Sequence, residues 1–195
     1  MQKRKKTNFE NLIKPIIYLD SCIIRNALNS RNKEDVTFLE ELRKRKYECK
    51  TSIYTLLELF EASKDRQYLI KLVANKYAEV NEFLRKRTER DLNYEELDDI
   101  SEQINSLFLK YEFIEICNIS GDEDWGLVKS ICETSNIHIS DIIHLTTAFI
   151  NNCTHLVTRD DFLIKEGNKM LEDNDVSKAN FIICKPEDIM KLFPE

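Results

Sequence analysis

Two acidic side chains in the second half of the chain lie in settings that suit chemistry on phosphates. Asp141 falls in the first turn of a helix predicted over residues 139–150, where its carboxylate meets the positive end of the helix dipole. Asp160 follows Leu156-Val157, a short apolar run typical of a buried parallel strand. Open α/β folds bind ligands at the carboxyl edge of such strands. Both acids are therefore candidates for one shared site.

Two further acids occupy comparable positions earlier in the chain. Asp20 ends an apolar run, residues 15–20, that is predicted to be the first strand. Glu58 lies inside the helix predicted after the second strand, among apolar neighbours where an unpaired carboxylate is costly to bury. Because parallel strands share one carboxyl edge, these two acids are expected to converge with Asp141 and Asp160.

Convergence of four carboxylates requires compensation of their charge. Two carboxylates about 4 Å apart repel each other by roughly 4 kcal/mol at an effective dielectric constant of about 20. Protons, solvent or a cation must offset this repulsion, and a set of oxygen ligands favours Mg²⁺ or Mn²⁺ over zinc. Such ions bind phosphates, activate water and stabilise the oxygen that leaves a phosphodiester. Taken singly, Asp141 also suits a helix terminus and Asp160 a turn, so the joint arrangement carries the hypothesis.

Other polar residues beside the acids have two readings each. His144 shares a helix face with Asp141, three residues away. It is a candidate for contact with a phosphate or metal, but we favour a structural histidine. Ser21 and Thr158 flank the acids and either orient a carboxylate or water, or make hydrogen bonds at strand ends.

Length and composition indicate one helix-rich globular domain. A chain of 195 residues, 42% hydrophobic and 33% charged, suits a single domain with a substantial core. Only 3 Gly and 3 Pro argue against disordered linkers. The formal charge of -6 gives no overall attraction to nucleic acid, although local basic patches can still steer binding.

The cysteines and the N-terminal segment indicate a reducing compartment. Six cysteines, at positions 22, 49, 117, 132, 153 and 184, form no close pair, so we interpret them as small buried hydrophobic residues. Residues 1–14 form a basic lead-in that no apolar segment follows, and a signal peptide is not predicted. No run reaches the length of a membrane span. We expect a cytoplasmic protein without membrane contact.

Alternating strand and helix patterns predict the scaffold of a domain over residues 15–195. Strands are expected at 15–20, 47–51, 112–116, 156–157 and 179–184. Helices are expected at 21–28, 34–47, 122–134 and 139–150, the last with Ser140 as its N-cap. Two more are expected to begin after Ser52, which serves as an N-cap, and at Pro186. Two long amphipathic helices over about 65–111 are expected to form an antiparallel hairpin. The alternation implies a doubly wound parallel sheet.

With these contexts the chain resembles the PIN-domain family of metal-dependent nucleases. The similarity lies in Tyr18-Leu19-Asp20-Ser21, Leu56-Leu57-Glu58-Leu59, Asp141-Ile142-Ile143-His144-Leu145 and Thr158-Arg159-Asp160-Asp161-Phe162, which together span residues 16–163. The resemblance implies a three-layer α/β/α sandwich with a central parallel sheet, to which the hairpin at about 65–111 is an addition. It also implies that Asp20, Glu58, Asp141 and Asp160 are catalytic metal ligands, with Asp161 as an auxiliary ligand.

Many members of this family are the toxin ribonucleases of bacterial toxin–antitoxin pairs (VapC-like). The resemblance therefore implies a Mg²⁺- or Mn²⁺-dependent endoribonuclease that hydrolyses RNA phosphodiester bonds, with a protein antitoxin and a homodimer as expected partnerships. Basic runs at 3–6, 43–46 and 85–87 are candidates for contact with the RNA backbone, weighed against ordinary solvated faces. Cys22, Thr147 and the long hairpin depart from the pattern of a minimal toxin.

The alternatives to an RNA-cleaving enzyme are a silent binding module, a DNA-cleaving enzyme and enzymes of other chemistry. A catalytically silent PIN-like module that binds RNA or a protein partner is the alternative, and DNA cleavage shares the same chemistry as RNA cleavage. A haloacid-dehalogenase phosphatase needs a second acid two residues after Asp20, where this chain has Cys22. The sequence contains no Gly-rich phosphate loop and no Ser/His/Asp order typical of acyl transfer.

Overall fold

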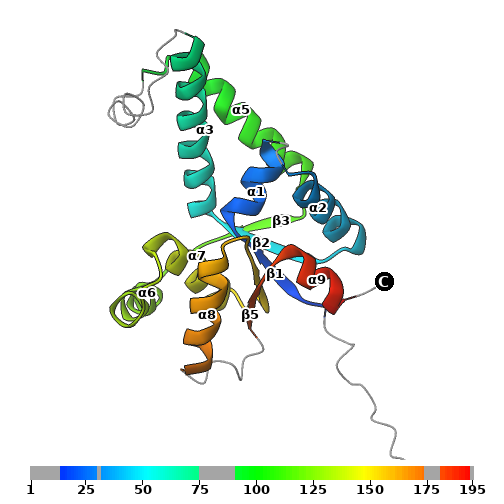
Figure 1. The fold of residues 1–195 in the computed structure, drawn as a ribbon, viewed down its shortest axis with the longest axis vertical. Coiled ribbons are helices and arrows are strands. Elements are labelled where there is room, and N and C mark those ends of the chain that lie inside the picture. The colour runs from blue at the N-terminus through cyan, green and yellow to red at the C-terminus, as the bar shows by residue number, and fades with distance from the viewer. Residues whose placement is uncertain (1–13, 30–31, 75–90, 174–180, 194–195) are drawn as a thin grey trace, which may run out of the picture.

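The computed structural model describes residues 14–29, 32–74, 91–173 and 181–193, and helices cover both faces of one sheet (Figure 1). The five strands are all parallel and lie in the order β3-β2-β1-β4-β5. They are β1 Ile16–Leu19, β2 Glu48–Ser52, β3 Ile114–Cys117, β4 His155–Val157 and β5 Ile182–Cys184. The predicted α/β class and the three-layer α/β/α sandwich are confirmed.

Alternate residues of the strands divide the interior into two hydrophobic cores. Successive side chains along a strand point to opposite faces of the sheet. In β1, Ile17 and Leu19 join one core and Tyr18 joins the other. In β4, Val157 and Leu156 are separated in the same way. Because both of its faces are covered, the central strand β1 is a continuous apolar run, whereas β2 and β3 also contain charged residues.

Each core is closed by its own layer of helices. The first layer consists of α1 Ser21–Leu28, α2 Lys33–Arg45, α5 Tyr94–Lys110, α9 Pro186–Leu192 and the start of α3 Ile53–Ala74. The second layer consists of α6 Asp122–Thr134, α7 Ile139–Ile150 and α8 Asp161–Asp173. Figure 1 shows the α3–α5 pair extending away from the sheet.

The first helix of the predicted hairpin begins earlier than the sequence pattern suggested. One helix, α3, runs without a break from Ile53 to Ala74, so the stretch from Asp65 onward is not a separate element. Ser52 Oγ accepts the backbone N–H of Thr55 at 3.2 Å, which confirms Ser52 as the cap of this helix. Continuous packing against α1 and α5 extends the helix through the position where the apolar pattern changes.

The return helix of the hairpin is fixed by its own cap and by an ion pair to α3. Asn93 and Glu96 form a reciprocal capping box at the start of α5. Lys71 Nζ of α3 lies 3.2 Å from Glu96 Oε2. Figure 1 shows α5 running back beside α3, as predicted for an antiparallel hairpin. The part predicted over residues 75–90 lies outside the described residues.

The cap of α7 differs from the prediction. His138, not Ser140, is the N-cap, and its Nδ1 accepts the backbone N–H of Ser140 at 3.3 Å. An imidazole nitrogen that accepts a hydrogen bond satisfies a helix N–H as a hydroxyl oxygen would. Asp141 stays in the first turn. The face of α7 that was predicted to be apolar and buried is not fully enclosed, because Phe149 on that face is 37% exposed.

The structure shows where the cysteines lie and whether any described helix could span a membrane. All six cysteines are free, and most are buried or partly buried, but Cys132 is exposed, so it is not a core residue. None of the helices in the described ranges combines the length and the apolar character needed to cross a membrane.

The order of the strands creates a switch point between β1 and β4. From β1 the chain proceeds to β2 and β3 on one side, then returns so that β4 pairs with the other side of β1. The register pairs Leu19 with Val157, so the two strands end together. Connections that leave such neighbouring ends in opposite directions open a crevice there, and this crevice is where open α/β sheets bind ligands.

Candidate metal centre

The end of β1 and the end of β4 fix the first acid of the site. Asp20 follows β1, and its backbone N–H donates to the Val157 carbonyl at 3.1 Å. Its side chain is almost completely buried, and Oδ2 accepts a hydrogen bond from Thr158 Oγ1 at 2.7 Å. For Thr158 the sequence predicts either orientation of a carboxylate or water, or a hydrogen bond at a strand end. In the structure Thr158 orients a carboxylate. A buried carboxylate needs such donors, because burial penalises its charge.

Glu58 reaches the same place from the first turns of α3. Its Oε2 lies 2.9 Å from His144 Nε2 on α7, and His144 Nε2 lies 3.6 Å from Asp20 Oδ1. Asp20, Glu58 and His144 each offer one ligand atom, and these three atoms lie within 4.8 Å of one another. Residues far apart in the chain thus form a candidate metal-binding cluster at the switch point.

His144 belongs to this cluster, whereas the sequence favoured a purely structural role. Burial alone would lower the pKa of His144, but the hydrogen bond to Glu58 and the charge of Asp20 outweigh burial and raise it overall. Its Nδ1 lies 2.8 Å from the Tyr18 hydroxyl. When protonated, the imidazole donates from both nitrogens, and the raised pKa favours this form beside the carboxylates. Its spacing of three residues from Asp141 was the signal for this placement.

The pKa of Glu58 responds to the same pairing. Burial of this half-buried carboxyl works against ionisation, but the hydrogen bond from His144 and its positive charge lower the pKa overall. Ser21, the other residue predicted to orient a carboxylate or to make a strand-end hydrogen bond, also lowers the pKa of Glu58 by hydrogen bonding to it. The raised pKa of His144 and the lowered pKa of Glu58 have a common cause, the contact between the two side chains, which favours the charged form of each.

The pKa of Asp141 is raised, in contrast to that of Glu58. Burial, followed by the negative charges of Asp20 and Asp160, raises its pKa from 3.8 to about 6. The positive influence of His144 is weaker than these effects. Asp141 is therefore within electrostatic reach of both acids, and this side of the cluster carries negative charge that the described residues do not fully compensate.

Asp160 has a structural role as well as a place beside the other acids. Its Oδ1 accepts the backbone N–H groups of Phe162 at 2.8 Å and Leu163 at 2.9 Å, which caps the start of α8. Its backbone N–H donates to Thr158 Oγ1 at 3.1 Å. Thr158 thereby connects Asp160 with Asp20. The cluster of ligand atoms within 4.8 Å contains Asp20 and Glu58 of the four predicted acids, with His144 as its third member, and does not include Asp141 or Asp160. That these four acids bind a metal stays a prediction.

Asp161, the predicted auxiliary ligand, points elsewhere. Its side chain is 81% exposed, and its Oδ1 lies 2.7 Å from Lys185 Nζ. This ion pair joins the start of α8 to the residue before α9, and it raises the pKa of Lys185. Proximity along the chain to Asp160 does not bring Asp161 into the cluster in this structure.

One buried ion pair that supports the site was missed by sequence reasoning. Asp35 is fully buried on α2, and its Oδ1 accepts from Arg159 Nε at 2.7 Å. Asn26 donates to Asp35 Oδ2 at 2.7 Å. Arg159 lies between Thr158 and Asp160, so this pair fixes the segment that supplies both residues. Asp35 resembles an ordinary first-turn helix acid in the sequence, and only the fold shows that it is enclosed.

Cys22, which departs from the family pattern, takes part in holding the same segment. Its Sγ accepts the backbone N–H of Arg159 at 3.3 Å and lies 3.5 Å from Thr158 Oγ1. Burial raises the pKa of the Cys22 thiol, and the charge of Asp20 adds to this effect. The residue is therefore a neutral thiol that packs beneath the site rather than a nucleophile.

The basic run at 43–46 is largely occupied by neighbours on its own helix. Arg43 pairs with Glu40 at 3.9 Å, and Lys44 and Arg45 each approach Glu41. This arrangement fits the solvated-face reading of that run. The runs at 3–6 and 85–87 lie outside the described residues.

The cluster of Asp20, Glu58 and His144 offers donor atoms that could hold a metal ion. Carboxylate oxygens from Asp20, Glu58, Asp141 and Asp160 are the ligands that Mg²⁺ and Mn²⁺ prefer. The pKa of Asp141 is raised first by burial and then by the negative charges of Asp20 and Asp160, and a cation would offset the repulsion from these charges. His144 adds an imidazole to the predicted all-oxygen set, but its nitrogens are engaged by Glu58 and Tyr18.

Comparison with known proteins shows similarity at the level of the fold. No family model matches the sequence, and no curated protein matches it. A chain in the crystal structure of VapBC2 from Rickettsia felis bound to a DNA fragment from their promoter is similar in structure, with a TM-score of 0.52 and 16% sequence identity. The match covers 87% of this chain and 98% of that chain. At this identity, the likeness concerns the arrangement of helices and strands.

Proposed function

We propose that this protein is a Mg²⁺- or Mn²⁺-dependent endoribonuclease that hydrolyses RNA phosphodiester bonds. The observation that supports the proposal is the cluster of Asp20, Glu58 and His144 at the β1–β4 switch point, together with Asp141, whose pKa is raised by burial and then by the charges of Asp20 and Asp160. Strongly perturbed acids in a ligand-binding crevice favour a functional site over a structural one.

Each residue has a defined part in the proposed mechanism. Asp20, which Thr158 orients, would hold the ion together with Glu58, Asp141 and Asp160. A bound Mg²⁺ or Mn²⁺ would supply Lewis-acid chemistry towards a phosphate oxygen and water. His144 holds Glu58 in its ionised form through the 2.9 Å hydrogen bond. Thr158 and the Asp35–Arg159 pair keep the acids in position without touching substrate.

The test is RNA cleavage with added Mg²⁺ or Mn²⁺. Asp20→Asn is expected to reduce cleavage by about a hundredfold or more, because it removes a central ligand and leaves the side-chain shape unchanged. Asp98→Asn, an exposed acid on α5, is the matched control and should cleave like the parent protein. Equal activity of Asp20→Asn and the parent would overturn the mechanism. Parallel assays on single-stranded DNA decide between the two nucleic acids.

A toxin role with a protein antitoxin as partner forms the biological side of the proposal. The support is the likeness of fold to a chain of VapBC2, which is described as bound to a DNA fragment from their promoter. Co-purification with the product of a neighbouring gene, followed by inhibition of cleavage by that protein, tests this role. A homodimer is tested on the same samples by sedimentation.

One observation favours a second candidate, a silent PIN-like module that binds RNA or a protein. His144 lies within 4 Å of both Asp20 and Glu58 and its pKa is raised, so its protonated form would neutralise part of the cluster without a metal. In that case RNA would bind without cleavage, and Mn²⁺ would leave the melting temperature unchanged. Cleavage that disappears with Asp20→Asn excludes this candidate.

A further inference from the structure

Arg25 is an exposed basic residue on α1, close to the acidic cluster. The helix begins directly after Asp20, and it packs beside α3, which carries Glu58 (Figure 1). Residues four positions apart share one face of a helix, so Arg25 lies on the same face as Ser21. Because Ser21 hydrogen bonds to Glu58, this is the face of α1 that borders the site.

The same face contacts α3 again one turn further on. Asn29 Oδ1 accepts a hydrogen bond from Arg66 of α3, and Asn29 Nδ2 donates to the Arg25 carbonyl at 2.9 Å. Contacts at Ser21 and at Asn29 therefore hold α1 against α3 on both sides of Arg25. The exposure of Arg25 places it at the solvent side of this helix pair, where a dissolved ligand can reach it.

The charge of Arg25 reaches the site without being used in an ion pair. It lowers the pKa of Glu58, so the guanidinium lies within electrostatic range of that carboxylate. Among the described residues, the Arg25 side chain forms neither an ion pair nor a hydrogen bond. An arginine in the last turn of a helix also suits the negative end of the helix dipole, and the experiments below separate that role from binding.

Other basic side chains at the carboxyl edge of the sheet are already paired. Arg159 lies 2.6 Å from Asp35, and Lys185 lies 2.7 Å from Asp161. A partner carboxylate occupies each of these cations and competes with any incoming anion. Of these three basic residues, Arg25 is the one whose charge stays available to a ligand.

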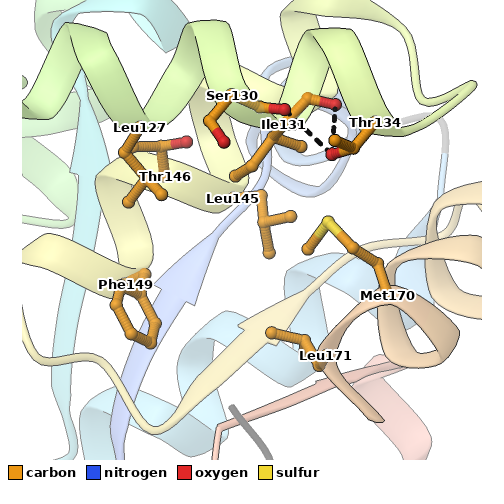
Figure 2. Close-up of a pocket in the computed structure, with 9 residues that line it drawn as sticks. All are labelled: Leu127, Ser130, Ile131, Thr134, Leu145, Thr146, Phe149, Met170 and Leu171. Atoms are coloured by element: carbon orange, nitrogen blue, oxygen red, sulfur yellow. Dashed lines mark hydrogen bonds between the residues drawn. The ribbon is translucent and has the colours of Figure 1, made fainter. Parts of the chain in front are cut away.

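The cavity among α6, α7 and α8 offers no comparable charge (Figure 2). Most of the nine side chains that line it are apolar, and none is basic. Thr146 in this lining is fully enclosed, and its hydroxyl has no hydrogen-bond partner among the described residues. A polyanionic substrate is therefore expected at the crevice beside Arg25 and not in this cavity.

We propose that Arg25 binds a backbone phosphate of the nucleic-acid substrate, next to the phosphate that is cleaved. A guanidinium matches the oxygens of a phosphate with two parallel hydrogen bonds. Four residues of helix advance by about 6 Å, so Arg25 is set back from Ser21 and from the acids and meets a neighbouring phosphate. Arg25 is thus a positioning residue for the substrate. This inference rests on the proposed function, because it assumes a phosphodiester chain at the acidic cluster.

The direct test is binding of fluorescein-labelled oligouridine of about 12 nucleotides to the full-length protein, followed by fluorescence anisotropy. Ca²⁺, which also takes carboxylate ligands, replaces Mg²⁺, and a gel checks that the RNA stays intact. Arg25→Met should weaken binding about tenfold or more, because a charge-assisted contact is lost. The slope of log Kd against log salt concentration should become shallower by about 0.7, the value for one phosphate contact on a single strand.

Two further variants identify the origin of the effect. Arg25→Lys retains the charge but not the paired hydrogen bonds, so it should keep the salt slope of the parent and lose only part of the affinity. Arg43→Met removes an exposed arginine of α2 that pairs with Glu40, and it should bind RNA as the parent does. Equal RNA affinity and equal salt slope in Arg25→Met and the parent overturn the inference, as does equal weakening by Arg25→Met and Arg43→Met.

Cleavage kinetics with Mn²⁺ separate substrate positioning from support of Glu58. A phosphate contact that is present before and during the reaction contributes to KM, so Arg25→Met should raise KM about tenfold and change kcat less than about threefold. A residue that only supports Glu58 or the end of α1 would leave KM and the salt slope unchanged and lower kcat or the midpoint of urea unfolding. That second pattern contradicts the phosphate contact.

The outcomes distinguish this inference from the proposed function. Cleavage by the parent with full RNA affinity in Arg25→Met would leave the nuclease in place and remove the role of Arg25. Absence of cleavage by the parent, with RNA binding that Arg25→Met weakens, would remove the nuclease and keep Arg25 as a phosphate contact of a binding module. A parent protein that does not bind the oligonucleotide overturns the phosphate contact in either case.

Discussion

His144 on α7 and Glu58 on α3 are 86 positions apart in the chain, and their side chains meet with Nε2 2.9 Å from Oε2. This contact makes the acidic cluster asymmetric. Glu58 faces an internal positive charge and has a lowered pKa, whereas Asp141 faces Asp20 and Asp160 and has a raised one. The need for an external cation is therefore concentrated on the side of Asp141.

The strength of the His144–Glu58 contact can be measured by a double-mutant cycle. His144→Gln and Glu58→Gln, alone and together, are expected to give a coupling free energy of about 1–3 kcal/mol in urea unfolding at neutral pH, because a buried imidazole and a half-buried carboxyl share a 2.9 Å hydrogen bond that favours the charged form of each. The cycle cancels packing losses that either substitution causes alone. A coupling energy near zero would mean that the two side chains do not interact in solution.

Mn²⁺ is expected to stabilise the folded protein against heat. A ligand at about 100 times its Kd adds about 2.7 kcal/mol to the free energy of unfolding, which corresponds to several degrees in Tm for a domain of this size. Asp20→Asn and Asp141→Asn should abolish this shift, and Glu58→Gln should retain part of it, because His144 already neutralises Glu58. The same shift in all four proteins would place the ion elsewhere.

Asp141 should make the metal-free protein less stable as the pH rises. Its folded-state pKa is raised from 3.8 to about 6, so the native state holds this proton more tightly than the unfolded chain. The stabilising contribution is complete below about pH 4 and is lost as the pH passes through about 6. In melts with a chelator, Asp141→Asn should match the parent protein near pH 4 and exceed it above pH 7. Parallel pH profiles for the two proteins would contradict this assignment.

Loss of Arg159 should be far more damaging than loss of a comparable surface arginine. Arg159→Met leaves Asp35 fully buried without its partner, which is expected to reduce the free energy of unfolding by about 3–5 kcal/mol. Arg43→Met breaks an exposed pair with Glu40 and should change it by less than about 1 kcal/mol. Urea unfolding of both variants checks the contrast. Similar losses would show that Asp35 is not enclosed as described.

The same variant connects stability with the candidate site. Arg159 lies between Thr158, which donates to Asp20, and Asp160, which caps α8. Where enough folded Arg159→Met protein is present, its Mn²⁺-induced stabilisation should be smaller than that of Arg43→Met. Equal stabilisation of the two variants by Mn²⁺ would restrict the Asp35–Arg159 pair to a purely structural role.

The sequence by itself determined the architecture and the edge of the sheet where the acids gather. Apolar runs ending in Asp20 and in Thr158 to Asp160 have the local character of buried parallel strands, and the order of helices and strands then implies a sandwich. These signals are local: side-chain periodicity, capping and strand ends depend on residues close together in the chain. That is why the element types and the Ser52 cap were predictable, while the cap of α7 and the length of α3 were not.

Only the tertiary structure decided which charges meet. The contact of His144 with Glu58 and the contact of Arg159 with Asp35 each depend on how α7, α3 and α2 pack around a sheet whose strands pair out of sequence order. Burial then raises the pKa of Asp141, and it leaves the hydroxyl of Thr146 without a hydrogen-bond partner. Long-range packing determines solvent exclusion and the distance between charges, and neither quantity is encoded in the spacing of residues along the chain.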